Sequence, residues 1–266
     1  MHGLLEGKVA VITGAGSGVG RAAVKLWAEN GAKVIAADIN LASAQETLAQ
    51  AGLGDDTARA VECNVADPAS VEAAVQAAVA AFGKLDAIYN NAGITIMPVP
   101  GVGLKSFTEA TVDEIKRVED VNINGVIYGC QSAVRQFEKQ GTAGAIVNTA
   151  SVAGMIGYGG VVYGTSKGAV VNLTRSLAIE VADRDIRVNS VCPAGMLTHY
   201  SGMDPDSPNA DAIKAGMGRV HPLGRSIDPA DTAAAAMFLC SDLASNITGV
   251  NLPVDGGLIA GRKVGG

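Results

Sequence analysis

Seven short apolar runs alternate along this chain with longer, Ala-rich stretches of helical character. Most of the runs are continuously hydrophobic, a pattern typical of strands that are covered on both faces. Repeated strand–helix–strand units predict a parallel sheet with right-handed crossovers. We therefore expect one doubly wound α/β domain with a parallel seven-stranded sheet and helices on both faces. The expected strands are 8–14, 33–39, 58–65, 85–93, 144–151, 186–195 and 249–257, and the clearest helices are 19–30, 68–82, 112–139 and 229–242.

The length of 266 residues suits a single domain, because no low-complexity linker and no fixed-period repeat divides the chain. We expect that domain to span residues 1–266. The least regular segment is 196–228, which follows the sixth expected strand and is rich in Pro, Gly, Asp and Met. A segment at such a place can close over a binding site, so we expect a lid there, with an ordinary surface excursion as the alternative.

Composition and charge exclude several classes of function. The formal net charge of -6 argues against a nucleic-acid partner. No run of about 18 apolar residues is present that could cross a membrane. The four cysteines form no CxxC pair and have no metal-ligand spacing to a histidine, so we expect buried, reduced thiols and no metal. Because no signal peptide precedes the first expected strand, the expected location is cytoplasmic.

The sequence TGAGSGVG at 13–20 joins the first expected strand to the first expected helix. Glycines in such a turn let the backbone approach a pyrophosphate, and the helix N-terminus directs N–H groups and its dipole toward negative charge. A glycine motif alone could be a tight turn without a ligand. Its place in the first strand–helix–strand unit favours a dinucleotide-binding site.

Asp38 ends the second expected strand. A carboxylate there can accept hydrogen bonds from both ribose hydroxyls of an adenosine and would repel a 2′-phosphate. No arginine or lysine lies in the surrounding sequence AADINLAS. NAD is therefore expected as the cofactor in preference to NADP, although Asp38 could also cap the helix that follows.

The order of motifs along the chain resembles the short-chain dehydrogenase/reductase family of single-domain enzymes. TGAGSGVG is similar to the glycine motif of that family, NNAG at 90–93 to its fourth-strand motif and VNING at 121–125 to its helix asparagine motif. NTAS followed by YGTSK at 163–167 is similar to its Ser…Tyr-x-x-x-Lys pattern, and ITGVNLPVDGG resembles its carboxyl-terminal strand. The resemblance covers nearly the whole chain and implies a single Rossmann-fold domain of the NAD-preferring type.

The resemblance implies a catalytic tetrad of Asn122, Ser151, Tyr163 and Lys167. Tyr163 would be the general acid/base, and its spacing to Lys167 puts both side chains on one face of a helix. A free phenol has a pKa near 10, and we expect the Lys167 ammonium and a positive nicotinamide ring to lower it. Ser151 would bind the substrate oxygen, Lys167 the nicotinamide ribose, and Asn122 a water that connects Lys167 to solvent.

The same resemblance implies cofactor contacts at the carboxyl ends of the strands, where open α/β sheets bind ligands. These residues are Gly14, Ser17, Gly18, Val19, Asp38, Ile39, Asn64, Val65, Asn91, Ala92, Gly93, Pro193, Met196 and Thr198, together with Tyr163 and Lys167.

The expected substrate wall is mostly apolar and contains no cluster of arginines that could hold a phosphate or a carboxylate. It consists of Ser151, Tyr163, Met97, Val152, Ile156 and Tyr158, with Ile96, Met196 and residues of 199–217 as further candidates. We expect His199 and His221 to be solvated loop residues and not catalytic groups.

Three positions depart from the family pattern. Asn64 replaces an aspartate, although its side-chain carbonyl can still accept from an adenine amino group. Pro193-Ala194-Gly195 replaces Pro-Gly, which leaves open the residue that contacts the nicotinamide carboxamide. The segment 94–111 is longer than the usual link, and its prolines and glycines predict a rigid, irregular loop near the substrate entrance.

The expected activity is the interconversion of a secondary alcohol and a ketone by hydride transfer, with a hydrophobic substrate such as a cyclic alcohol. One alternative is a 3-oxoacyl-thioester reductase that uses NADPH, which Asp38 argues against. Another is a non-catalytic dinucleotide sensor, since a fold does not fix a function, but a sensor has no need of Ser151, Tyr163 and Lys167 together. The expected partners are a small alcohol or ketone and, from the family resemblance, three further copies in a homotetramer.

Overall fold

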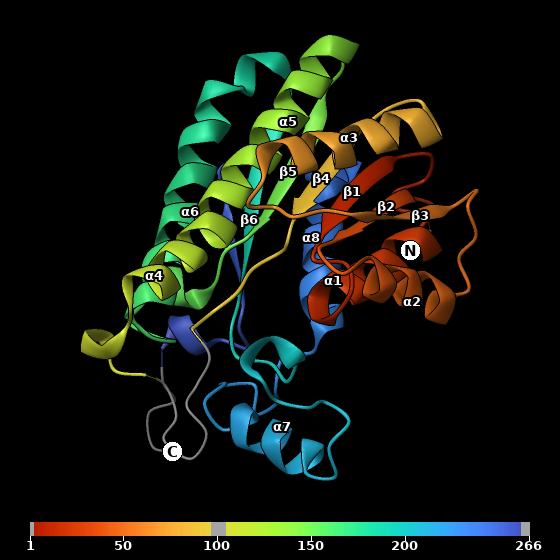
Figure 1. Cartoon of the computed structure of the whole chain (residues 1–266). Helices are drawn as coiled ribbons and strands as arrows, with labels where there is room; N and C mark the ends of the chain where they lie inside the picture. The colour runs from red at the N-terminus through yellow and green to blue at the C-terminus, as the bar shows by residue number, and fades with distance from the viewer. Residues whose placement is uncertain (1–2, 97–104, 262–266) are drawn as a thin grey trace.

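A computed structural model of the protein describes residues 3–96 and 105–261. Within these residues, seven parallel strands form one sheet in the order β3-β2-β1-β4-β5-β6-β7, as the sequence predicts (Figure 1). Expected loop residues 97–104 lie outside the described part of the chain. The strands are β1 (Val9–Thr13), β2 (Lys33–Asp38), β3 (Ala58–Glu62), β4 (Ala87–Asn90), β5 (Gly144–Thr149), β6 (Ile186–Pro193) and β7 (Asn251–Val254).

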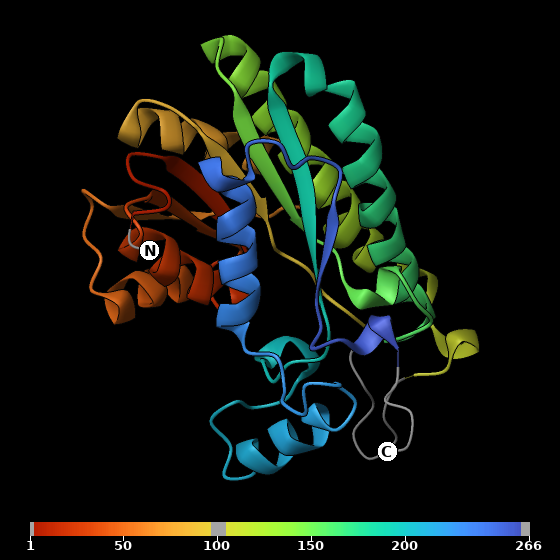
Figure 2. The same ribbon diagram turned by 180° about the vertical axis from the view of Figure 1, so that it is seen from behind.

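Helices cover both faces of the sheet, which explains why the strands are hydrophobic along their whole length. Figure 1 shows one face, which carries α3 (Pro68–Phe82), α5 (Gly125–Gln140) and α6 (Val161–Glu180). Figure 2 shows the opposite face, with α8 (Pro229–Cys240) in front. The second layer is completed by α1 (Gly18–Glu29) and α2 (Leu41–Ala51).

Strand β1 shows how one sequence serves both layers. Val9 and Val11 pack into the core beneath α3 and α5, whereas Ala10 and Ile12 pack into the core beneath α1 and α8. Successive side chains of a strand point to opposite faces, so both faces require apolar residues. All four cysteines are free and buried, as expected.

Local sequence explains where several helices begin. The Asp67 carboxylate accepts a 3.0 Å hydrogen bond from the Ala69 N–H, and Pro68 occupies the first turn of α3. Asp228 and Pro229 start α8 in the same way. Helices α2, α3 and α5 end at glycines in the left-handed conformation, Gly52, Gly83 and Gly141. The boundaries thus follow from capping residues that flank the apolar faces.

The sequence predicts one continuous helix at 112–139, and this prediction is wrong because the helix is interrupted. The chain forms α4 (Val112–Glu119), a π-helical turn at Asp120–Asn124 and then α5. The N–H of Gly125 donates to the carbonyl of Asp120, five residues earlier. Such π turns are rare and occur often at functional sites. The turn carries Asn122, whose contacts are described below.

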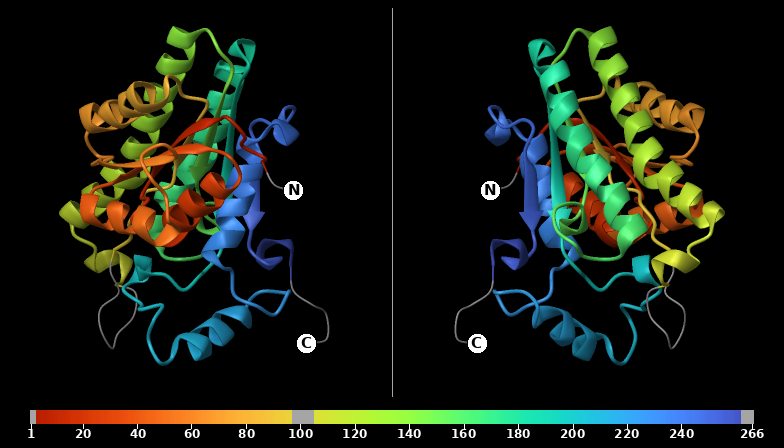
Figure 3. Two further views of the ribbon diagram at one scale, coloured as in Figure 1. Left: turned by 90° about the vertical axis from the view of Figure 1, so that its right-hand side faces the viewer. Right: turned by 90° about the vertical axis from the view of Figure 1, so that its left-hand side faces the viewer.

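The irregular segment after β6 lies beyond the carboxyl edge of the sheet (Figure 3). It contains the short helical turn η5 (His199–Ser201) and the helix α7 (Ala210–Gly218). Figures 1 and 2 show α7 separated from the two helical layers and below the ends of the strands. Among the described residues, no helix is both long and apolar enough to cross a membrane.

Candidate active site

A cavity of about 1050 Å³ opens at the carboxyl edge of the sheet. Its lining comes from the turn after β1, from the ends of β2 to β6 and from the segment that follows β6. Strand β1 lies between β2 and β4, so successive connections run to opposite sides of it. Such a switch point is where doubly wound sheets bind ligands.

The glycine turn after β1 is shaped by two close approaches of the backbone. Gly14 has a φ of 66°, a conformation that L-residues with a side chain rarely adopt. A Cβ on Gly20 would collide with the carbonyl oxygen of Gly14. Because glycine occupies both positions, the backbone can turn tightly here. Helix α1 then begins at Gly18. This geometry leaves helix N-terminal N–H groups at the cavity, where an anion can bind.

Asp38 at the end of β2 is oriented by two backbone hydrogen bonds. Its carboxylate accepts a 2.8 Å bond from the Gly16 N–H and a 2.9 Å bond from the Asn40 N–H. A carboxylate offers about four acceptor sites, so two remain after these bonds. Asp38 also lines the cavity. The side chain is therefore held in place and can still accept from two ligand hydroxyls.

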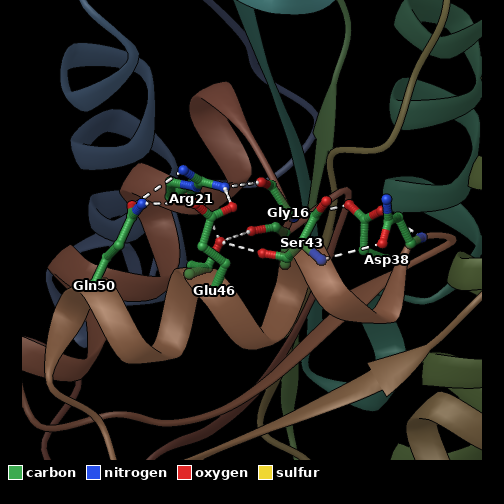
Figure 4. A network of polar contacts seen from close by, with 9 residues as sticks. Gly16, Arg21, Asp38, Ser43, Glu46 and Gln50 are labelled. Carbon is green, nitrogen blue, oxygen red and sulfur yellow. Dashed lines mark hydrogen bonds and ion pairs between the residues drawn. The ribbon is translucent and has the colours of Figure 1, made fainter.

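Arg21 of α1 holds the glycine turn from its other side (Figure 4). Its guanidinium donates to the Gly16 carbonyl at 2.6 Å and to the Glu46 carboxylate at 3.0 Å. It also donates to Thr47 and Gln50, at 3.1 Å each. The positive charge of Arg21 is thus directed to α2 and the turn.

Ser151, Tyr163 and Lys167 meet at the end of the cavity formed by β5, β6 and α6. Tyr163 is half-buried, and Lys167 Nζ lies 5.7 Å from the centre of its ring. The buried Ser151 hydroxyl donates to the Pro193 carbonyl at 3.2 Å and accepts from the Ala153 N–H at 3.1 Å. The helical face predicted from the Tyr-Lys spacing is present, and it forms one wall of the cavity.

The expected lowering of the Tyr163 pKa is wrong for the protein's own groups. Burial raises the pKa of this phenol, and hydrogen bonding with Ser151 and Tyr200 counteracts burial only in part. Burial likewise lowers the pKa of Lys167 to about 8. Below pH 8 the ammonium remains charged and donates a 2.7 Å bond to the Thr149 carbonyl. Burial therefore favours the neutral form of both groups.

Asn122 does not line the cavity. Its buried amide exchanges two 2.8 Å hydrogen bonds with the backbone of Ile94, as acceptor from the N–H and donor to the carbonyl. It also donates to the Ser166 hydroxyl at 3.0 Å. A Cβ on Gly93 would lie 3.4 Å from both Asn122 Oδ1 and Lys167 Nζ, so both groups lie close to Gly93. Asn122 thus ties together the chain after β4, the π turn and α6.

Every residue predicted to contact the cofactor lies along this one cavity, from the glycine turn through Asp38, Asn64 and Asn91 to Thr198. What these residues bind stays a prediction. The Asn64 side-chain oxygen already accepts from the Ala66 N–H at 3.1 Å, which leaves one of its lone pairs for a ligand.

The predicted substrate wall is only partly supported. Tyr158 lines the cavity beside Ser151 and Tyr163. Val152 does not, because the turn after β5 folds it into a small core with Ala194 and Ile227. Ile156 is 40% exposed and also lies outside the lining. Met97 lies outside the described residues.

The range 199–217, expected to supply further wall residues, contributes Tyr200, Met203 and Met217 to the cavity lining. Thr95 also lines the cavity and was not singled out from the sequence. His199 is exposed, as expected, and lines the cavity. His221 is buried, against expectation, because it packs on Gly256 and bonds the Arg225 carbonyl at 2.8 Å.

Comparison with known proteins agrees with this geometry. A family model described as enoyl-(acyl carrier protein) reductase matches residues 14–259. The 3beta-hydroxysteroid dehydrogenase 2 of Eggerthella lenta is 41% identical over 260 residues, which cover 96% of this chain and 95% of that protein. The cyclohexanol dehydrogenase of an Acinetobacter species is 39% identical, with 96% of each chain covered.

A solved structure shows the same fold. The 3-ketoacyl-(acyl-carrier-protein) reductase from Brucella melitensis, complexed with NADH, superposes with a TM-score of 0.83. It is 38% identical, and the match covers 96% of this chain and 99% of that one. The fold is that of a Rossmann-type oxidoreductase. The chain belongs to the short-chain dehydrogenase/reductase family.

Proposed function

We propose that the protein is an NAD-dependent oxidoreductase that interconverts a secondary alcohol and a ketone, with Tyr163 as general acid/base. The observation that carries this proposal is that one cavity joins two sets of groups. Asp38 and the glycine turn lie at one end, and Ser151, Tyr163 and Lys167 lie at the other. The named alcohol dehydrogenases among the relatives support the reaction class.

The residues present fit a nicotinamide dinucleotide. The glycine turn offers backbone room and N–H groups to a pyrophosphate, and Asp38 has acceptor sites left for two ribose hydroxyls. Arg21 is engaged by Glu46 and the Gly16 carbonyl, so its charge is not free to attract a 2′-phosphate. These contacts support NAD over NADP. When bound, the oxidised cofactor supplies a hydride acceptor and a positive charge.

Ser151 and Tyr163 are proposed to hold the reacting oxygen of the substrate. In alcohol oxidation Tyr163 takes the hydroxyl proton, and in ketone reduction it returns that proton to the carbonyl oxygen. Its raised pKa keeps the phenol protonated at neutral pH, as proton donation to a ketone requires, whereas its role as a base requires additional positive charge nearby. Ser151 stabilises negative charge on the same oxygen.

Lys167 is proposed to supply both charge and orientation. One of its three N–H groups is used by the Thr149 carbonyl, which leaves two for a ribose of the cofactor. Asn122 bonds Ile94 and Ser166, the residue that precedes Lys167 on α6. The water that we expected Asn122 to hold, as a link from Lys167 to solvent, stays a prediction.

Two other functions remain to be separated from this one. The Brucella melitensis protein is named a 3-ketoacyl-(acyl-carrier-protein) reductase, which favours a 3-oxoacyl-thioester reductase as second candidate. A dinucleotide sensor is the non-catalytic alternative. The test incubates purified protein with each coenzyme and either cyclic, aryl and steroid alcohols or a 3-oxoacyl thioester, and follows absorbance of the reduced cofactor.

We expect turnover of an alcohol with NAD. Tyr163→Phe should lower kcat by about 10²- to 10⁴-fold while NADH still binds, because only the proton-transfer group is lost. Preferred reduction of the thioester with NADPH would support the second candidate. Cofactor binding without any turnover would support the sensor, and full activity of Tyr163→Phe would remove Tyr163 from the mechanism.

A homotetramer and a cytoplasmic location also stay predictions. Apolar side chains are exposed on α6, where Ile179 is 80% and Val161 56% exposed. Burial of such side chains against a second copy is consistent with the assembly through α5 and α6 that the family resemblance implies. Light scattering of the purified protein measures the number of subunits, and a monomer would contradict this proposal.

A further inference from the structure

Tyr200 lies directly against the proposed general acid/base. Its ring centre is 5.8 Å from that of Tyr163, with 59° between the ring planes. The turn η5 that carries it is capped by Thr198, whose hydroxyl accepts from the Tyr200 N–H at 3.4 Å. Tyr200 is 39% exposed and lines the cavity, as does Thr95. A second phenol thus stands at the reaction centre on the substrate side.

The hydroxyl-bearing side chains of Thr95, Tyr200 and Tyr163 line the same cavity. Hydrogen bonding with Tyr200 lowers the pKa of Tyr163, and the same contact raises the pKa of Tyr200. Hydrogen bonding with Thr95 lowers the pKa of Tyr200. Each hydroxyl can donate or accept in these contacts. Tyr200 therefore lies beside the group that the substrate must also reach.

A substrate oxygen that reaches Tyr163 lies next to Tyr200. The Tyr163 oxygen has two acceptor sites and must accept from the reacting hydroxyl during oxidation. Tyr200 and Thr95 line the cavity beside this position. A second substrate oxygen can exchange hydrogen bonds with their hydroxyls.

Resting on the function proposed above, we propose that Tyr200 and Thr95 bind a second substrate oxygen on the carbon next to the reacting one. Two oxygens on adjacent carbons can lie about as far apart as two hydrogen-bonded hydroxyls, about 2.8 Å. A vicinal diol can therefore place one oxygen on Ser151 and Tyr163 and the other on Tyr200. The preferred substrate class is accordingly vicinal diols and the matching hydroxyketones, over alcohols with a single oxygen.

The test compares 1,2-cyclohexanediol, as separate cis and trans isomers, with cyclohexanol. The ratio of kcat/KM values with NAD is measured for the wild type, Tyr200→Phe, Thr95→Val and the control Tyr128→Phe. Tyr128 packs on the core from α5 and does not line the cavity. Dissociation constants of the three alcohols in the presence of NADH, followed by cofactor fluorescence, measure the same preference without turnover.

We expect the wild type to prefer one diol by about tenfold, as one additional hydrogen bond to the substrate implies. Tyr200→Phe should lower that ratio about tenfold, Thr95→Val should lower it less, and Tyr128→Phe should leave it unchanged. A wild-type ratio near one, or a ratio unchanged in Tyr200→Phe, would overturn the inference alone. Diol-selective binding that Tyr200→Phe abolishes, without turnover of any alcohol, would overturn the proposed function and leave the diol site standing.

Discussion

The ammonium of Lys167 donates a 2.7 Å hydrogen bond to the carbonyl of Thr149, and only 2% of the lysine is exposed. Burial lowers its pKa from an ordinary value near 10.5 to about 8. At neutral pH the folded protein therefore carries a buried charge that the unfolded chain would leave in water. The lowering of the Lys167 pKa corresponds to a cost of about 3 kcal/mol in the free energy of unfolding.

We expect Lys167→Met to stabilise the fold while abolishing turnover. The variant removes the cost of the buried charge. Loss of the hydrogen bond to Thr149 destabilises the fold by about 1 kcal/mol, which offsets part of that gain. A net increase of about 1–2 kcal/mol in the free energy of unfolding is expected at pH 7. The wild-type cost fades as pH rises from about 8 to 10.5, because folded Lys167 is neutral there while the unfolded lysine still binds a proton. Denaturant unfolding at pH 7 and pH 10 measures both effects, and a variant less stable than the wild type at both values would contradict them.

Asp38→Ala should erode the preference for NAD over NADP. The substitution removes the acceptor of the ribose hydroxyls and the charge that repels a 2′-phosphate. The ratio of kcat/KM values for the two coenzymes measures the effect. Glu62→Gln is the matched control, because Glu62 pairs beside Asp38 in the sheet and does not line the cavity. An unchanged ratio in Asp38→Ala would refute the proposed ribose contact.

Tyr200→Phe should move the pH dependence of alcohol oxidation to higher pH. Hydrogen bonding with Tyr200 lowers the pKa of Tyr163, so removing the Tyr200 hydroxyl raises that pKa. The base form of Tyr163 then appears at higher pH, and the acidic limb of the kcat/KM profile shifts upward with it. The same profile in Tyr128→Phe should match the wild type. A downward shift, or none, would show that the two phenols do not interact in solution.

Gly20→Ala should destabilise the protein severely, by about 3 kcal/mol or more, because the new methyl group meets the Gly14 backbone. Gly216→Ala provides a matched control in α7, where no atom lies within 4 Å of an added Cβ. Alanine is the better helix former, so the control should be neutral or slightly more stable. Thermal unfolding of both variants measures the difference. Equal melting temperatures would mean that the glycine turn can relax.

The fold was largely predictable because its main determinants are local. Continuous apolar runs mark the strands of a sheet covered on both faces, and the order of the glycine turn, Asp38 and the Tyr-Lys pair marks the edge where they meet. The π turn at 120–124 was not predictable in the same way. It carries Asn122, which bonds Ile94, 28 residues away in sequence, and no local pattern encodes that contact.

The substrate side was least predictable for a related reason. Tyr200 reaches Tyr163 because the segment after β6 contributes to the cavity lining, and loop residues carry no periodic signal of what they approach. Val152 was placed wrongly because its neighbour Ser151 does line the cavity, while a short helical turn directs Val152 into the core. The pKa of Tyr163 depends on how deeply the site is buried, which spacing alone does not express.

The turn that faces the cofactor site is fastened from behind by α2. Thr47 donates to the Ala15 carbonyl at 2.9 Å, and Arg21 links the Gly16 carbonyl to Glu46. The shape of the turn is thus set by groups that do not line the cavity, and binding has little loop entropy left to overcome. Redirecting Arg21 to a 2′-phosphate would break its bonds to the Gly16 carbonyl and Glu46 and so loosen the turn.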